Sequence, residues 1–174
     1  MKHLEPFGPN AEENIRRVEK GEKVKFPADY REFLLTIGGG VFPKVQDSPE
    51  ENRPELLRIS GQSDGETIDD RIRVLFGCIH EQNWHYDIEG NLRLMFGSED
   101  NPNKIIPIAL TDHQNMFVMV LNKRKKDCGY IYYHDMQALF DASEGDNNCF
   151  YYLADNFTEF AELINNEDQM LMTM

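Results

Sequence analysis

Cysteine is scarce in this chain of 174 residues, and its spacing forms no recognisable motif. The three cysteines, Cys78, Cys128 and Cys149, are odd in number and include no C-x-x-C pair. This excludes a dense disulfide framework and is typical of a reducing compartment. No stretch approaches the roughly 18 consecutive apolar residues that a transmembrane helix requires. The first ten residues contain no apolar signal-peptide core, so we expect no secretion signal, a cytoplasmic location and no membrane contact.

Basic residues are few relative to acidic ones. The chain has 18 lysines and arginines against 31 aspartates and glutamates, a formal net charge of -13. Such an excess repels nucleic acid phosphates and anionic membranes and favours basic partners. It would equally serve solubility alone, and charge by itself does not separate these alternatives. The hydrophobic fraction of 40% is enough for a core, which excludes global disorder.

Catalytic and metal-binding motifs are also absent from the sequence. No G-x-S-x-G elbow occurs, and Cys78 and His80, two residues apart on one predicted strand, do not by themselves make a nucleophile–base pair. Cys78, His80 and His85 are three possible zinc ligands, but their spacing matches neither C-x-x-C nor H-E-x-x-H. The glycines at 38–40 follow a helix, whereas a phosphate-binding loop precedes one. We therefore expect no catalytic residue, no metal and no cofactor.

Helices are predicted near both ends of the chain. Asn10 is a candidate cap for a first helix that ends at Gly21. Pro27 is suited to the start of a second helix, which the glycines at 38–40 would end. Asp155 or Asn156 would cap the last helix, and a further helix is expected over 136–140 after Asp135. The apolar stripes of the second and last helices are Tyr30, Phe33, Leu34 and Ile37, and Phe157, Phe160, Ala161 and Ile164.

The middle of the chain is predicted to be mostly β-structure. Short strands are expected over 56–59, 72–79 and 105–110, and Pro107 indicates an edge strand or a bulge. Two hairpins are expected, one pairing 84–88 with 92–96 and one pairing 116–121 with 130–133. We interpret the basic tip of the second hairpin, 123–126, as solvated charge that discourages edge pairing. Residues 60–70 are expected to form an exposed loop or a short helix.

Five segments, in order, resemble the SUKH superfamily of immunity proteins. Residues 26–39 read FPADYREFLLTIGG and are similar to the family's opening helix and glycine turn, although Gly38 stands where the family often has asparagine. The later segments read VLFG at 74–77, IPIA at 106–109 followed by Asn115, GYIYY at 129–133 and LADNFTEF at 153–160. Two departures are His113-Gln114 before Asn115, where the family usually has glycine, and the acidic stretch 64–70, which does not align.

The resemblance covers about residues 11–165 and implies one α+β domain over residues 1–174. Its fold would be a central, largely antiparallel sheet with flanking N- and C-terminal helices, and 167–174 would be a frayed tail. The signature residues fill the core and form turns, so they supply no catalytic group. The resemblance implies function by protein binding, because many bacterial members neutralise toxins while fungal relatives act as regulators and scaffolds.

We therefore expect an immunity protein that binds a cognate, basic protein toxin such as a nuclease. The alternative is a regulatory or scaffold module that binds an endogenous protein, and the oligomeric state stays open. Because apolar stripes occupy the core, binding specificity is expected on loops, although these acids would also suit solvated loops. Trp84, the only tryptophan, fits a hairpin core better than a binding hot spot. The predicted partner-binding residues are Asp64, Glu66, Asp69, Asp70, Glu99, Asp100, Glu144 and Asp146.

Overall fold

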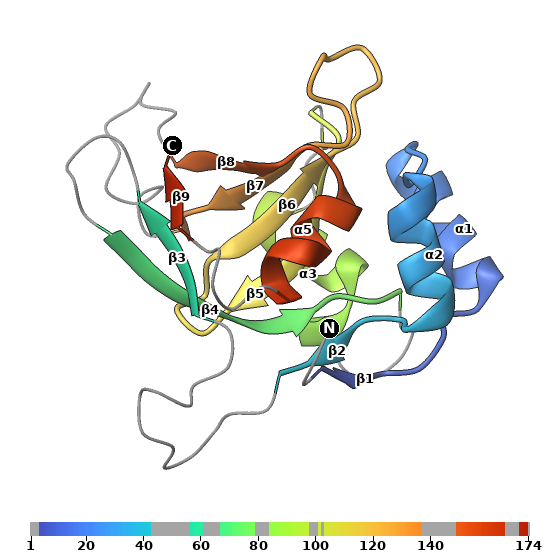
Figure 1. The fold of residues 1–174 in the computed structure, drawn as a ribbon. Helices are drawn as coiled ribbons and strands as arrows, with labels where there is room; N and C mark the ends of the chain where they lie inside the picture. Colours follow the sequence, from blue (N-terminus) through green and yellow to red (C-terminus); the bar gives the residue numbers. More distant parts are fainter. Residues whose placement is uncertain are drawn as a thin grey trace.

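An antiparallel sheet forms the centre of the molecule (Figure 1). The computed structural model describes residues 4–42, 56–60, 67–78, 84–97, 101, 103–136, 149–165 and 171–173. The strand order is β1-β2-β4-β5-β6-β7-β8, and each neighbouring pair is antiparallel. These strands are β1 (Glu5–Pro6), β2 (Gly40–Val41), β4 (Thr67–Leu75), β5 (Ile105–Thr111), β6 (Met116–Val120), β7 (Ile131–His134) and β8 (Phe150–Ala154).

Two further strands extend the sheet beside β4. Strand β3 (Leu56–Ser60) pairs antiparallel with β4, and β9 (Leu171–Thr173) pairs parallel with β3. Residues 171–173 are thus a strand where the sequence indicated a frayed tail. Residues 60–70 were expected to form an exposed loop or a short helix. This is wrong for residues 67–70, because β4 begins at Thr67. Of the helix predicted over 136–140, only Met136 is described, and residues 137–140 lie outside the described residues.

Helices flank the sheet, as the fold class predicted. They are α1 (Glu12–Glu22), α2 (Ala28–Thr36), α3 (Ile88–Phe96) and α5 (Phe157–Asn165). Helix α2 contacts both α1 and α5, and α5 crosses in front of the sheet in Figure 1. In the part of the chain that is described, no helix has the length and apolar character needed to cross a membrane.

Aromatic side chains from α2, α5 and β6 join the helices to the sheet. The Phe157 ring lies 4.8 Å from both Tyr30 and Phe33, measured between ring centroids. Phe160 is 5.3 Å from Phe117 of β6. All five residues are buried, which confirms the predicted apolar stripes. Burying each such ring contributes roughly 1.5–3 kcal/mol, so this cluster is a main source of stability.

Strand β5 shows why a proline is tolerated inside a sheet. The register with β6 shifts between Pro107 and Ala109, so the proline sits at an irregularity in the ladder. The bulge alternative is thereby confirmed. The edge alternative is wrong, because β5 has β4 on one side and β6 on the other.

The predicted hairpin over 84–96 is wrong, because this segment is helical. A 3-10 turn, η2 (Trp84–Tyr86), leads into α3, and the Asp87 side chain accepts a hydrogen bond from the Gly90 backbone N–H. Residues 89–91 are therefore the first turn of a helix and not a hairpin turn. Ile88 and Leu92, four residues apart, are buried on one face of this helix.

Asn10 also has a different role from the predicted helix cap. Helix α1 begins after Ala11 without a side-chain cap, whereas Asn10 is buried. Its Nδ2 donates to the Gly38 carbonyl at 3.3 Å, and its Oδ1 accepts from the Cys78 N–H at 2.7 Å. Asn10 thus joins the end of α2 to the chain after β4. Gly38 has a φ of 79°, and a Cβ there would collide with the Gly8 carbonyl, so glycine is required.

Candidate functional site

Most of the predicted acidic binding residues lie outside the described part of the chain. These are Asp64, Glu66, Glu99, Asp100, Glu144 and Asp146. Asp69 is in β4, in register with Arg58 of β3. Asp70 is the next residue of β4 and is fully buried. The exposed position expected for Asp70 is therefore wrong, and a binding role for the other seven residues stays a prediction.

The Asp70 carboxylate is the centre of a buried polar cluster. Its Oδ2 accepts hydrogen bonds from Asn115 Nδ2 at 3.0 Å and from the Tyr133 hydroxyl at 2.9 Å. Its Oδ1 accepts from the Arg71 N–H at 2.8 Å and lies 3.1 Å from His113 Nδ1. Burial first, and then the Asp70 charge, raise the pKa of Tyr133, so its hydroxyl remains a donor. This cluster joins β4, the β5–β6 turn and β7, which is a structural role.

The candidate zinc ligands do not form a metal-binding arrangement in the described residues. Cys78 is fully buried, and this burial raises the pKa of its thiol. A thiol that stays protonated is a poor nucleophile at neutral pH. His85 is exposed, and His80 lies outside the described residues. Within those residues, no group of three His, Cys, Asp or Glu side chains is arranged to hold a metal.

The most distinctive exposed surface lies on the outer side of β7 and β8. We call it the aromatic face and define it as Tyr130, Tyr132, Phe150 and Tyr152. Phe150 and Tyr152 are 38% and 41% exposed, an unusual state for large apolar side chains. The Tyr152 ring makes edge contacts with Tyr130 and Tyr132, at centroid distances of 5.6 and 6.0 Å. These contacts hold the rings in fixed positions on a sheet, which favours binding at low entropic cost.

Carboxylates border the aromatic face. The Tyr132 hydroxyl donates to Asp127 Oδ2 at 3.3 Å, and the Tyr152 hydroxyl donates to Asp155 Oδ1 at 3.0 Å. Burial and the bond to Asp155 raise the pKa of Tyr152 to about 12, and the Asp155 charge raises that of Tyr130. The tyrosines therefore stay neutral at physiological pH. An aromatic centre with an acidic border has the chemistry of an interface for a basic protein.

The aromatic face was not predicted from the sequence, although a signal for it was present. Residues 132–133 and 150–152 place aromatic side chains at consecutive positions of two strands. Since successive strand residues point to opposite faces, only one set can enter the core. Tyr133 and Tyr151 pack on the core, whereas Phe150 and Tyr152 are exposed and Tyr132 is half-buried.

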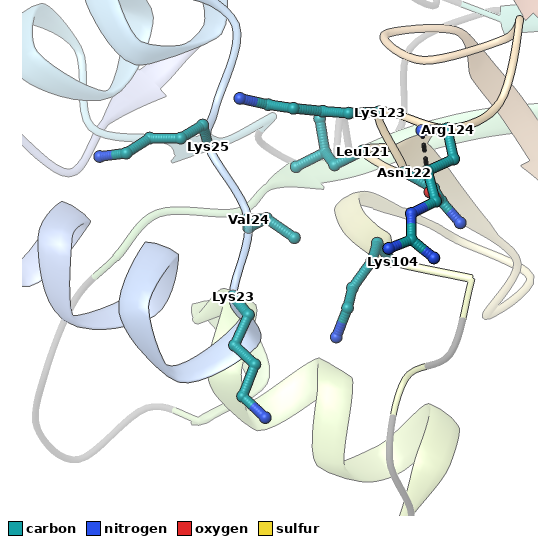
Figure 2. Close-up of a pocket in the computed structure, with 8 residues that line it drawn as sticks. All are labelled: Lys23, Val24, Lys25, Lys104, Leu121, Asn122, Lys123 and Arg124. Atoms are coloured by element: carbon teal, nitrogen blue, oxygen red, sulfur yellow. Dashed lines mark hydrogen bonds between the residues drawn. The ribbon is translucent and has the colours of Figure 1, made fainter.

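A second feature is a basic pocket between α1 and the β6–β7 hairpin (Figure 2). We call it the basic pocket; its volume is about 440 Å³. All four basic residues of the hairpin tip, 123–126, are exposed as expected, and the first two of them reach this pocket. The sequence did not indicate the pocket because three distant segments form it. Its lining residues are Lys23, Val24, Lys25, Lys104, Leu121, Asn122, Lys123 and Arg124.

Comparison with known proteins identifies a family. The family model described as the SMI1 / KNR4 family (SUKH-1) matches residues 9–163 of the chain. This range contains every segment on which the resemblance was based. No curated protein matches the chain.

Proposed function

Because the chain belongs to the SMI1 / KNR4 family (SUKH-1), we propose that it is an immunity protein that works by binding another protein. The proposed target is a cognate, basic toxin domain such as a nuclease, neutralised in the cytoplasm by occlusion of its active site. The observation that carries the proposal is the aromatic face with its acidic border. We further propose that this face is the centre of the interface.

Electrostatics support a basic target. A nuclease must hold phosphates and therefore presents positive charge to its substrate. A protein with a net charge of -13 is attracted to such a surface and can associate with it rapidly. Phe150 and Tyr152 would then supply the apolar contacts, because exposed aromatic side chains carry much of the energy of protein interfaces.

The test is co-expression with a toxin domain encoded beside this gene, followed by co-purification. We expect the wild-type protein to restore growth and to form a stable complex. The double variant Phe150→Ser/Tyr152→Ser should weaken binding at least tenfold, equivalent to about 1.4 kcal/mol. Leu94→Ser is the matched control, because Leu94 is 58% exposed but lies on α3. Lack of rescue and of a complex with the wild type would refute the toxin role, and equal binding by the double variant would refute the site.

The acidic residues predicted from sequence form a second arm of this test. Asp70 must be left unchanged, since reversing a buried charge would unfold the protein whatever its role. We propose reversing Asp64, Glu66 and Asp69 together to lysine, with Lys125→Glu/Lys126→Glu as the control. A slower association for the acidic variant alone would support a binding role. Association within about twofold of the parent would exclude this stretch.

The same face would serve a regulatory or scaffold module that binds an endogenous protein. Family membership is compatible with this alternative. A neighbouring gene for a large secreted polypeptide with a toxin-like C-terminal domain would favour the immunity role. Capture of one endogenous protein, without any effect on a toxin, would favour the alternative.

A further inference from the structure

Cationic side chains gather at the basic pocket, although the chain as a whole is acidic. Five of its 18 lysines and arginines line this pocket, and none of the described lining residues is acidic. Lys25 has a carboxylate partner, Glu19 Oε2, at 3.1 Å. In Figure 2 the Lys25 ammonium points away from the pocket. The side chains of Lys104, Arg124 and Lys23 lie around the part of the pocket that is next to Val24. Lys23, Lys104, Lys123 and Arg124 have no ion pair with any described residue.

The backbone adopts a left-handed conformation at two of these lysines. Lys23 and Lys104 have φ values of 55° and 53°, in the left-handed region that favours glycine and asparagine. A side chain with a Cβ costs about 1–2 kcal/mol there. Strained positions of this kind are concentrated at functional sites. Placing a lysine at both positions brings two ammonium groups to one pocket at a cost in stability.

The position of Lys104 is fixed by its neighbours. Buried Asn101 accepts from the Ile105 N–H at 3.0 Å and donates to the Ile105 carbonyl at 2.7 Å. The Lys104 carbonyl accepts from the Leu121 N–H at 2.8 Å. The segment before β5 is thereby attached to the start of the basic hairpin. The backbone of the two segments that carry these cations is held together before any ligand arrives, which lowers the entropic cost of binding.

We propose that the basic pocket binds a compact phosphate-bearing anion of the triphosphate class. Lysine ammonium groups bind phosphate as point charges, and the forked guanidinium of Arg124, the one arginine among the described lining residues, can pair with two phosphate oxygens at once. The volume of the basic pocket lies within the range of about 300–1,000 Å³ typical of small-ligand sites. Among the described lining residues the apolar ones are Val24 and Leu121, and none is an aromatic residue on which a base could stack.

The overall charge argues against an extended polyanion. A nucleic acid strand that continued past the pocket would meet a molecule of net charge -13. A compact anion is held by the local cations alone and avoids that repulsion. Inorganic triphosphate and the triphosphate group of a nucleotide share the required chemistry. The proposal does not depend on the toxin-binding role.

The test is calorimetric titration of the purified chain with inorganic triphosphate at about 50 mM and about 200 mM salt. We expect binding that weakens with salt and a loss of at least tenfold in Lys104→Gln/Arg124→Gln. Lys125→Gln/Lys126→Gln is the matched control, because it removes the same charge from exposed residues that do not line the pocket. It should stay within about twofold of the parent, well below the tenfold that 1.4 kcal/mol represents. Circular dichroism checks that both variants are folded.

Further arms identify the source of the anion. Equal affinity for ATP and inorganic triphosphate would support recognition of phosphate alone, and tighter binding of ATP would identify a nucleotide. Hexaglutamate binding as tightly as triphosphate would overturn the proposal in favour of an acidic peptide, and tightest binding of a single-stranded oligonucleotide would overturn it in favour of nucleic acid. Absence of triphosphate binding, or an equal loss in both double variants, would also overturn it. None of these results bears on toxin binding.

Discussion

His134 is a buried histidine whose pKa is shifted far from its ordinary value. Its ring is buried and stacks on Phe150 at a centroid distance of 4.2 Å, with an angle of 3° between the rings. Neither ring nitrogen has a hydrogen-bond partner among the described residues. Burial lowers the pKa of His134 from 6.5 to about 4, and the nearby Asp135 only partly opposes this effect. The folded protein therefore keeps this imidazole neutral over a range in which the unfolded chain protonates it.

This difference in pKa predicts that the protein begins to lose stability on acidification at a pH above the range in which carboxylates titrate. Between pH 6.5 and about 4 the unfolded chain binds more protons at His134, so the free energy of unfolding falls as the pH is lowered. The full effect amounts to about 3 kcal/mol. His134→Phe keeps the ring stack and removes the titration, so the variant should lose this part of the pH dependence. Urea denaturation of both proteins at several pH values measures the free energy of unfolding. The contributions of the carboxylates cancel when the value for the variant is subtracted from the value for the wild type. A difference between the proteins that does not change with pH would contradict the prediction.

At the scale of elements, one turn connects three strands through Asp70. Asn115 follows β5, and its Oδ1 also accepts from the Met136 N–H at 3.0 Å, just beyond β7. Asp70→Ala would leave the Asn115 amide and the Tyr133 hydroxyl without this acceptor inside the protein. Each such loss costs about 1–3 kcal/mol, so we expect the free energy of unfolding, measured by chemical denaturation, to fall by about 2–6 kcal/mol in total.

The control for Asp70→Ala is His113→Ala. The His113 side chain is 69% exposed and lies against the same carboxylate, so its loss should cost less than about 1 kcal/mol. If Asp70→Ala were as mild as the control, the cluster would not hold these strands together.

The elements that were predictable from sequence are those whose signals are local and unopposed. Pro27 and the glycines after α2 bracket a helix, and Asn156 caps α5 by accepting from the Glu159 N–H at 2.9 Å. The error over 84–96 arose where two local signals compete. Residues 89–91 resemble a hairpin turn, but Asp87 caps a helix two residues earlier and buried Ile88 and Leu92 favour it. Burial on the completed sheet decides between them, and the sequence does not display that contact.

The remaining failures concern contacts between distant segments. Asn10 has the sequence signature of a cap, yet its partners are 28 and 68 residues away. Strand β9 exists through its pairing with β3, more than a hundred residues earlier in the chain. The basic pocket likewise combines three segments, each of which alone resembles an ordinary solvated surface. The family resemblance specified the fold but supplied no partner-binding residue for either surface.

At the scale of the whole molecule, charge and apolar exposure are distributed unevenly. Cations gather at the basic pocket, and exposed aromatic rings gather on β7 and β8, where Asp127 and Asp155 border them. The two surfaces are proposed to bind different partners, an anion at the basic pocket and a basic protein at the aromatic face. Residues 121–130 connect them, because Lys123 and Arg124 line the basic pocket while Asp127 and Tyr130 belong to the aromatic face and its border. The two proposed partners would therefore bind at different places on the molecule.

The charge distribution leads to a prediction about the rate of association with the proposed basic partner. Steered encounters reach about 10⁸–10⁹ M⁻¹s⁻¹ at low salt, against about 10⁵–10⁶ without steering. Raising the salt from about 0.01 M to about 1 M shortens the screening length from about 30 Å to about 3 Å. We expect the association rate to fall at least tenfold over this range, while the dissociation rate changes much less. Stopped-flow or surface-based kinetics with the purified partner measure both.

A pair of matched variants locates the steering charge. Asp127→Asn/Asp155→Asn preserves the acceptors for Tyr132 and Tyr152 while removing two charges beside the aromatic face. Glu5→Gln/Glu13→Gln removes two charges from exposed residues of the first turn of α1 and of β1, which lies at the opposite edge of the sheet from β8 (Figure 1). Both variants have a net charge of -11, from -13 plus 2. Because attraction between close charges exceeds that between distant ones, the first variant should associate more slowly than the second at low salt and equally fast at high salt. Equal slowing of both variants at low salt would mean that the partner approaches another surface, even if the total charge still attracts it.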